Sequence, residues 1–170
     1  DDLVTGVQTC ALPILLAAVS THSYREVRDG LAELIDAELV FRRGYSDEDV
    51  YFFKHALVQD AAYQSMLNRS RHELHGRIAR VLEDKYPDRV EAEPELLAHH
   101  LTEARLDERA ISYWLRAGER AAGQSANQEA VAHLQRGLRL LETLDDEKVR
   151  LETELRFQLL LRSEEHTSEL

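Results

Sequence analysis

The spacing of apolar residues near the N-terminal end predicts one amphipathic helix. Val27, Leu31 and Leu34 recur at intervals of three and four residues, which places them on one face of a helix over residues 24–37. Ser23 precedes this stretch, and a glutamate follows Ser23 three residues later, as in a capping box that satisfies the first free amides of a helix. The sequence therefore predicts a helix with a defined start and one buried face.

The next stretch predicts a β-hairpin and then a second helix. Residues 39–43 and 50–54 are rich in β-branched and aromatic side chains, and residues 44–49 between them are typical of a turn. Residues 57–67 return to helical spacing, with Leu57 on the side that is expected to pack. A helix followed by a hairpin is the second half of a winged-helix fold, which we take as the interpretation of this part of the chain.

Beyond the hairpin the chain is predicted to be helical. Ser70 fits a second capping box and begins a helix that ends near Lys85, with Pro87 as its stop signal. Residues 88–93 are mostly charged and are expected to form a linker. This part is interpreted as a connecting helix and linker.

Further helices are predicted over residues 94–104, 107–122, 125–144 and 145–159. Asp107 and Ser125 are expected to cap the second and third of these helices. The predicted fold is mainly α-helical. Its parts are a partial winged-helix domain over residues 15–67, a connecting segment over residues 68–93 and antiparallel helical pairs over residues 94–161.

The helical pairs resemble the tetratricopeptide repeat, a unit of two antiparallel helices. The positions that match its packing residues are Trp114, Ala117, Gly118 and Ala121 in the first helix and Ala130, Leu134, Gly137 and Leu138 in the second. The small residues at these positions are expected to let the two helices approach closely. Ala121 stands where the repeat has a tyrosine, and a generic helical hairpin is the alternative. Such repeats need stacked neighbours, so the resemblance implies further helical repeats as partners.

The two ends of the chain resemble translated sequencing-adapter DNA. DNA that can encode residues 162–170, when reverse-complemented, overlaps DNA that can encode residues 4–14. Two unrelated protein ends are not expected to be writable as the two strands of one oligonucleotide. We therefore interpret residues 1–14 and 162–170 as adapter-like artefacts and leave them out of fold prediction.

Charge and composition restrict the function. The formal net charge is −11, and without the two ends 27 acidic and 20 basic residues leave −7. Residues 15–67 alone contain nine acids and five bases. Because phosphate binding needs a basic surface, this balance argues against nucleic acid as a partner. No apolar run is long enough to span a membrane, so we expect no membrane partner and a cytoplasmic location.

The sequence offers little chemistry of its own. It has no G-x-x-x-x-G-K-[ST] stretch and no nucleophile motif, so the fragment is not expected to be an enzyme or to hold a cofactor. His72 and His75 lack an evident third metal ligand. His99 and His100 are adjacent, which sets them about 100° apart around a helix and makes a shared ion difficult. The sequence therefore predicts no catalytic residue and no metal site.

The strand-to-helix stretch from Phe53 to Tyr63 carries the strongest resemblance. It is similar to the winged-helix junction of bacterial signal-transducing (STAND/AAA-type) regulatory ATPases, which carry a helical-repeat arm. These arms are found behind class III adenylate/guanylate cyclase or Ser/Thr kinase domains. The resemblance implies that His55 reaches the β-phosphate of ADP bound to a neighbouring domain, with Lys54 as a weaker candidate. Ala56 departs from the motif, which has an acid there. The alternative is a structural His55 that caps the helix and packs against Tyr63.

The resemblance implies a non-catalytic regulatory fragment of a signalling ATPase. ATP or ADP then belongs to an upstream ATPase domain, which would be a partner in the parent chain. The helical pairs would bind a protein or a small-molecule inducer. Two alternatives remain open: a free-standing repeat scaffold that binds peptides, and a winged-helix regulator that binds DNA.

Overall fold

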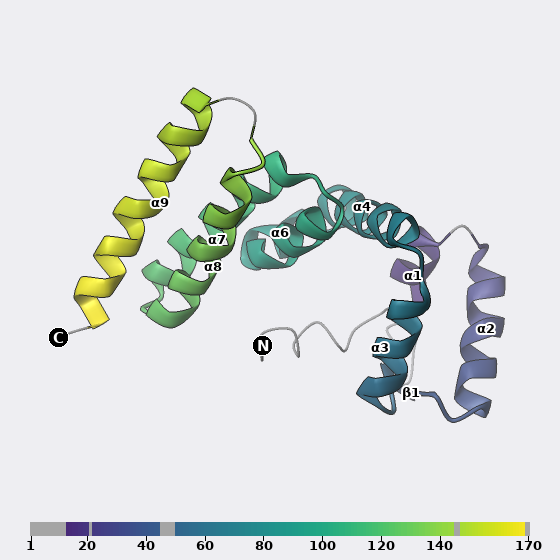
Figure 1. Ribbon diagram of the computed structural model, residues 1–170. Coiled ribbons are helices and arrows are strands. Elements are labelled where there is room, and N and C mark those ends of the chain that lie inside the picture. The colour runs from purple at the N-terminus through teal and green to yellow at the C-terminus, as the bar shows by residue number, and fades with distance from the viewer. Residues whose placement is uncertain (1–12, 21, 45–49, 145–146, 169–170) are drawn as a thin grey trace. The chain divides into compact units, whose positions relative to one another are not determined.

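The chain forms two compact units, each built mainly from α-helices. The computed structural model describes residues 13–20, 22–44, 50–144 and 147–168 (Figure 1). The first unit comprises Asp1–Arg71 and the second His72–Leu170. The prediction of a mainly α-helical fold with one β-hairpin is confirmed.

The first unit has a small apolar core in its described part. Its elements are α1 (Pro13–Val19), α2 (Tyr24–Asp36), β1 (Val40–Arg43), β2 (Val50–Phe53) and α3 (Ala56–Ser65). The buried apolar side chains described in this unit are Val19, Leu31 and Val40, one each from α1, α2 and β1. Leu31 of the predicted apolar face of α2 is buried, whereas Leu34 of that face is 38% exposed, so only part of the face lies in the core.

The predicted capping box at the start of α2 is confirmed. The backbone N–H of Ser23 donates to the Glu26 carboxylate at 2.7 Å, and the backbone N–H of Glu26 donates to Ser23 Oγ at 3.3 Å. These bonds satisfy two amides that the first turn of a helix leaves free. The hydrogen bonds from the Ser23 side chain and backbone lower the pKa of Glu26.

The hairpin strands pair antiparallel, with Val40 opposite Phe53 and Phe41 opposite Phe52. The rings of Phe41 and Phe52 stack with their centroids 5.1 Å apart. Val40 is buried, whereas Phe41 is 41% exposed, because alternate side chains of a strand point to opposite faces. The hairpin therefore joins the core through one face. The predicted turn at residues 45–49 lies outside the described residues.

The second unit is made of helices that follow one another through short connections. They are α4 (Asn68–Lys85, which begins at the end of the first unit), α5 (Pro87–Ala92), α6 (Pro94–Glu103), α7 (Asp107–Gly123), α8 (Asn127–Leu141) and α9 (Glu147–Ser168). Helices α7, α8 and α9 lie side by side (Figure 1). The adapter-like stretch 162–168 continues α9, and residues 1–12, 169 and 170 lie outside the described residues.

Two clusters of buried side chains form the core of the second unit. The first cluster joins α4, α5, α6 and α7 through Ala79, Leu82, Val90, Leu97, Ala98, Leu101, Ala110, Trp114 and Ala117. The second joins α7, α8 and α9 through Ile111, Leu115, Leu134, Leu141 and Phe157. Helix α7 contributes to both clusters, so it is the central element of this unit.

Two glycines allow the close packing of the central helices. A Cβ added at Gly118 would lie 2.5 Å from Leu134 Cγ, and one added at Gly137 would lie 2.5 Å from Phe157 Cε1 and 3.1 Å from Trp114 Cβ. Real Cβ atoms do not approach so closely, so larger residues at these positions would force the helices apart. Because Trp114 meets Gly137 and Gly118 meets Leu134, α7 and α8 run in opposite directions.

Three helices end in the same backbone motif. Each places a non-glycine residue at positive φ after its last turn: Glu38 (59°), Arg105 (60°) and Ser125 (60°). In each case the next amide donates to the carbonyl five residues earlier: Leu39 to Leu34 (3.0 Å), Leu106 to Leu101 (2.9 Å) and Ala126 to Ala121 (3.0 Å). This is the pattern of a Schellman motif, which satisfies the free carbonyls at a helix end. Its αL residue is usually glycine, and here it is not.

Several predicted helix boundaries in the second half are wrong. Helix α4 begins at Asn68, so Ser70 lies within its first turn and is not its N-cap. Pro87 begins α5, because the fixed φ of proline suits the first helical position, and residues 88–93 are largely helical rather than a linker. Val90 of α5 is buried in the first core cluster, which explains why this stretch folds.

The predicted caps of α7 and α8 are also wrong. Asp107 is the first residue of α7, and Leu106 occupies the N-cap position. Helix α8 begins at Asn127 with Ala126 as its N-cap, and Ser125 takes the positive φ of the preceding turn. Both errors have one cause: the turn that closes the preceding helix also fixes where the next helix begins.

The second unit also begins at a different place from the predicted boundary. The division falls after Arg71, and residues 72–93 share the core of the following helices. The segment predicted as a separate connection over residues 68–93 is therefore largely part of the second unit. Its Ala79 and Leu82 are buried in the core cluster that also contains residues of α5, α6 and α7.

Replacing Gly118 with alanine should destabilise the second unit by about 1–3 kcal/mol, because the new methyl group overlaps the Leu134 side chain. The measurement is the urea midpoint of the full chain. Gly123→Ala is the matched control, since it lies in the same helix with nothing within 4 Å of the added Cβ. It should not destabilise the chain, and the higher helix propensity of alanine should stabilise it by at most about 1 kcal/mol. Equal midpoints for Gly118→Ala and the unmodified chain would contradict the packing argument.

Candidate functional site

The strand-to-helix junction presents His55 to solvent. His55 is the N-cap residue of α3, with extended backbone angles (φ −135°, ψ 129°), and its side chain is exposed. Among the described residues its ring makes no capping hydrogen bond to α3. The capping role in the structural alternative for His55 is therefore wrong.

Lys54 belongs to the same junction, but its charge is engaged. Its Nζ lies 3.1 Å from Glu38 Oε2, and its backbone N–H donates to the carbonyl of Leu39 at 2.9 Å. Glu38 is the positive-φ residue between α2 and β1. The end of the hairpin is thus tied to the turn after α2, and an approaching phosphate would compete with Glu38 for Lys54.

Helix α3 does not pack as predicted within the described part of its unit. None of its residues is buried, and Leu57, expected on the packing side, is 81% exposed. Leu67, just beyond the helix, is 76% exposed. Leu57 is thus an exposed apolar side chain two residues after His55, whereas Leu67 lies beyond the other end of α3.

The residues predicted as repeat-packing positions belong to α7 and α8, and most of them are buried. The buried ones are Trp114, Ala117, Gly118, Ala121, Ala130, Leu134 and Gly137, and Leu138 is partly buried against the second core cluster. Ala110 and Ala130 lie twenty positions apart, each as the fourth residue of its helix, and both are buried.

Trp114 connects the helices around it. Its Nε1–H donates to Thr102 Oγ1 of α6 at 3.0 Å, and its ring stacks on His133 of α8 with centroids 5.5 Å apart. The Arg136 guanidinium lies 5.2 Å from the ring centroid, as in a cation–π contact. Burial lowers the pKa of His133, so its ring is neutral where it stacks on the tryptophan.

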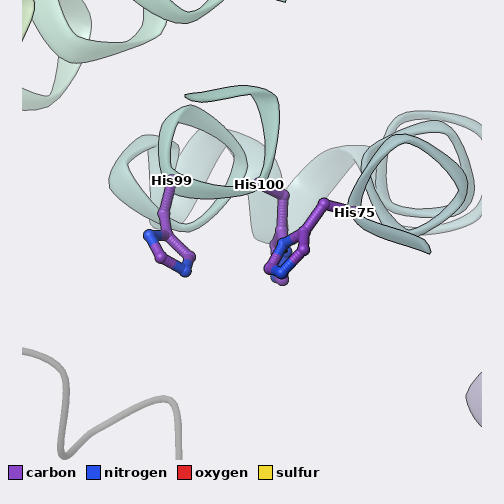
Figure 2. Close-up of side chains that lie close together, drawn as sticks. All are labelled: His75, His99 and His100. Carbon is purple, nitrogen blue, oxygen red and sulfur yellow. The ribbon is translucent and has the colours of Figure 1, made fainter. Parts of the chain in front are cut away.

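A cluster of three histidines lies elsewhere in the second unit. His75 comes from α4, and His99 and His100 come from α6. All three rings point to one side of these helices (Figure 2). One ring nitrogen from each residue lies within 4.8 Å of the others, and the Nδ1 atoms of His75 and His100 are 2.9 Å apart in an N–H···N hydrogen bond. These are the residues of the described chain with the geometry to hold a metal ion.

The expectation that adjacent histidines would not face a common point is wrong. The rings of His99 and His100 have centroids 5.4 Å apart, and His75 lies 5.8 Å and 5.0 Å from them. Side-chain rotation compensates for the angle between neighbouring positions on a helix. His72 does not join the cluster, because its Nδ1–H donates to the carbonyl of Glu103 at 2.6 Å.

Burial controls the protonation of the cluster. His75 and His100 are buried, and His99 is half-buried. Burial, with the charges of His99 and His75 adding to it, lowers the pKa of His100 from 6.5 to about 3. Burial also lowers the pKa of His99, opposed by the charge of Glu103. His99 and His100 are therefore neutral near pH 7, and each neutral imidazole has one ring nitrogen that can bind a metal ion.

One sequence signal could have revealed this cluster. His75 lies four and seven residues before the buried Ala79 and Leu82, so it belongs to the apolar stripe of α4. A histidine on such a stripe is expected to face another element. The identity of that element, however, follows only from the pairing of α4 with α6.

The comparisons with known proteins give one match. The chain is similar to an uncharacterized protein of Rhizobium meliloti (strain 1021), with 26% identity over 137 residues. The match covers 81% of this chain but only 13% of that protein's length. No family model and no solved structure matches the chain. Among the described residues, no helix has both the length and the apolar content needed to cross a membrane.

Acid should destabilise the second unit through His100. Its folded pKa lies below the unfolded value of 6.5, so the unfolded chain binds the proton more tightly and unfolding becomes easier as pH falls below 6.5. Between about pH 7 and about pH 5 the loss should be about 2 kcal/mol. Urea unfolding in EDTA measures it.

His100→Gln should make that loss clearly smaller, whereas His22→Gln, which replaces an exposed histidine of the first unit, should leave it unchanged. A pH dependence that is the same in His100→Gln and in the unmodified chain would contradict the assignment to His100.

Proposed function

We infer that this chain is a non-catalytic regulatory segment of a larger signalling ATPase. The first unit would respond to the nucleotide held by an upstream ATPase domain, and the helical pairs of the second unit would bind a protein or a small-molecule inducer. The observation that carries this proposal is the exposed His55 at the strand-to-helix junction, next to the exposed Leu57. A polar group beside an uncovered apolar surface suits docking against another domain.

The chemistry of the junction favours a phosphate as the group that His55 meets. His55 directly precedes α3, whose first amides and helix dipole favour an anion. An exposed imidazole can donate a hydrogen bond to a phosphate oxygen, and Lys54 lies next to it in the chain. In this proposal ADP contacts would hold the resting form, and loss of those contacts would change how the first unit docks.

One further observation supports a segment within a longer protein, and another bears on the DNA-binding alternative. The matched Rhizobium meliloti protein is much longer than the aligned region, which is 13% of it. The acidic balance of the first unit disfavours nucleic acid, so the DNA-binding alternative has less support than docking to a protein domain.

A repeat scaffold that never meets nucleotide is the second candidate. The observation that favours it is a row of exposed leucines on α9, with Leu151 57%, Leu155 61% and Leu159 60% exposed. Their spacing of four residues puts them on one helical face. Another helical pair could stack on that face. The regulatory segment allows such stacking, and the repeat scaffold requires it.

The test of the regulatory proposal is His55→Ala in the full-length parent protein. If His55 donates to a phosphate, its loss should weaken ADP binding roughly 10- to 100-fold, since hydrogen bonds to charged groups contribute about 1.5–3 kcal/mol. Basal activity should rise as the resting form is lost. Isothermal titration with ADP and an ATPase assay measure the two effects.

His22→Ala is the control, because His22 is an exposed histidine of the same unit away from the junction. Lys54→Ala should have a smaller effect than His55→Ala. Unchanged ADP affinity and unchanged basal activity in His55→Ala would exclude the phosphate contact and leave the scaffold as the better description.

A further inference from the structure

The three histidines of the second unit have the arrangement of metal ligands. In a tetrahedral site with Zn–N bonds of about 2.0–2.1 Å, neighbouring nitrogens lie about 3.3 Å apart. The Nδ1 atoms of His75 and His100 are 2.9 Å apart, and the three ligand atoms all lie within 4.8 Å of one another. Small side-chain rotations bring all three to one ion.

We propose that His75, His99 and His100 bind one divalent transition-metal ion of the zinc class and thereby join α4 to α6. Three imidazoles suit Zn²⁺, Co²⁺, Ni²⁺ and Cu²⁺ and not the oxygen-seeking Mg²⁺ or Ca²⁺. Three protein ligands leave a fourth position for water or another small ligand.

The surroundings favour the metal-bound form. Metal binding requires neutral imidazoles, and burial keeps His99 and His100 neutral. Glu103 lies one helical turn after His99, and its negative charge acts on that ring. A nearby carboxylate offsets part of the positive charge that a metal ion brings.

Packing of the helices orients the three histidines without a bound metal ion. His75 lies on the same stripe of α4 as the buried Ala79 and Leu82, and His100 lies next to the buried Leu101 in α6. A metal ion would replace the single hydrogen bond between His75 and His100 with a coordination bond to each. Preorganised ligands of this kind lose little conformational freedom on binding.

The direct experiment is metal titration of the full chain, purified without a histidine tag. Cys10→Ser is present throughout, because it removes the only thiol of the sequence. Calorimetry with Zn²⁺ should show one site per chain. Co²⁺ should give the strong visible absorption of a four-coordinate site, and Zn²⁺ should raise the unfolding temperature by roughly 5 °C or more. Absence of saturable Zn²⁺ and Co²⁺ binding would overturn the proposal.

Variants locate the site. His99→Gln is the main variant, because His99 is half-buried and its replacement disturbs the core least. It should weaken Zn²⁺ binding at least about 100-fold, beyond the 10- to 100-fold typical of changing a residue that only hydrogen-bonds to a metal ligand. His72→Gln is the control: it changes a half-buried histidine of α4, the helix that carries His75, and its Nδ1 is held by the Glu103 carbonyl. Its Zn²⁺ affinity should stay within about threefold of that of the unmodified chain.

Folding of each variant is checked by circular dichroism in EDTA. His75→Gln and His100→Gln should also lose binding, but the His99→Gln result decides if either of these fails to fold. Zn²⁺ affinity that is unchanged in a folded His99→Gln, or that falls equally in His72→Gln, would overturn the assignment to this cluster.

Discussion

The close approach of α7 and α8 is the constraint on which the second unit depends. Leu134 occupies the space that a side chain at Gly118 would need, and the Phe157 ring does the same at Gly137. Trp114 fills the gap beside Gly137 and also belongs to the core cluster that α4, α5 and α6 share. Because Gly118 and Gly137 have no side chains, α7 can contribute residues to both core clusters. A wider separation of α7 and α8 would open cavities in each cluster. Tight interiors tolerate such changes poorly, because nearby atoms cannot fill the space.

The two units differ in how much they bury, and this difference bears on function. The described part of the first unit buries one apolar side chain each from α1, α2 and β1, and its α3 buries none. Segments with few buried contacts open more readily than well-packed ones. Docking against another domain would therefore change the stability of α3 and its junction more than that of the second unit. The better-packed second unit and the more exposed α3 suit the proposed division of roles between the two units.

The sequence predicted most of what depends on local spacing. The capping box at Ser23, the face of α2 and the two strands were found because periodicity and short-range hydrogen bonds decide them. The starts of α7 and α8 were misplaced, since the preceding backbone turns fix them and those turns use Arg105 and Ser125 in place of the expected glycine. The histidine cluster was missed because two of its members are neighbours in the chain and the third lies on another helix. Pairing of helices is a tertiary property that no single window contains.

The repeated helix ending has a consequence for how the arm is built. The motif at Arg105 recurs twenty residues later at Ser125, with the same bond from the following amide to the carbonyl five residues earlier. Neither residue is glycine, so the reversal is specified by backbone hydrogen bonding and by the small or apolar residue that follows, not by a sequence signature. The same backbone motif thus makes the chain reversal at both helix ends. Because the reversal depends on backbone hydrogen bonds, substitutions that keep those bonds leave the connection between the helices unchanged.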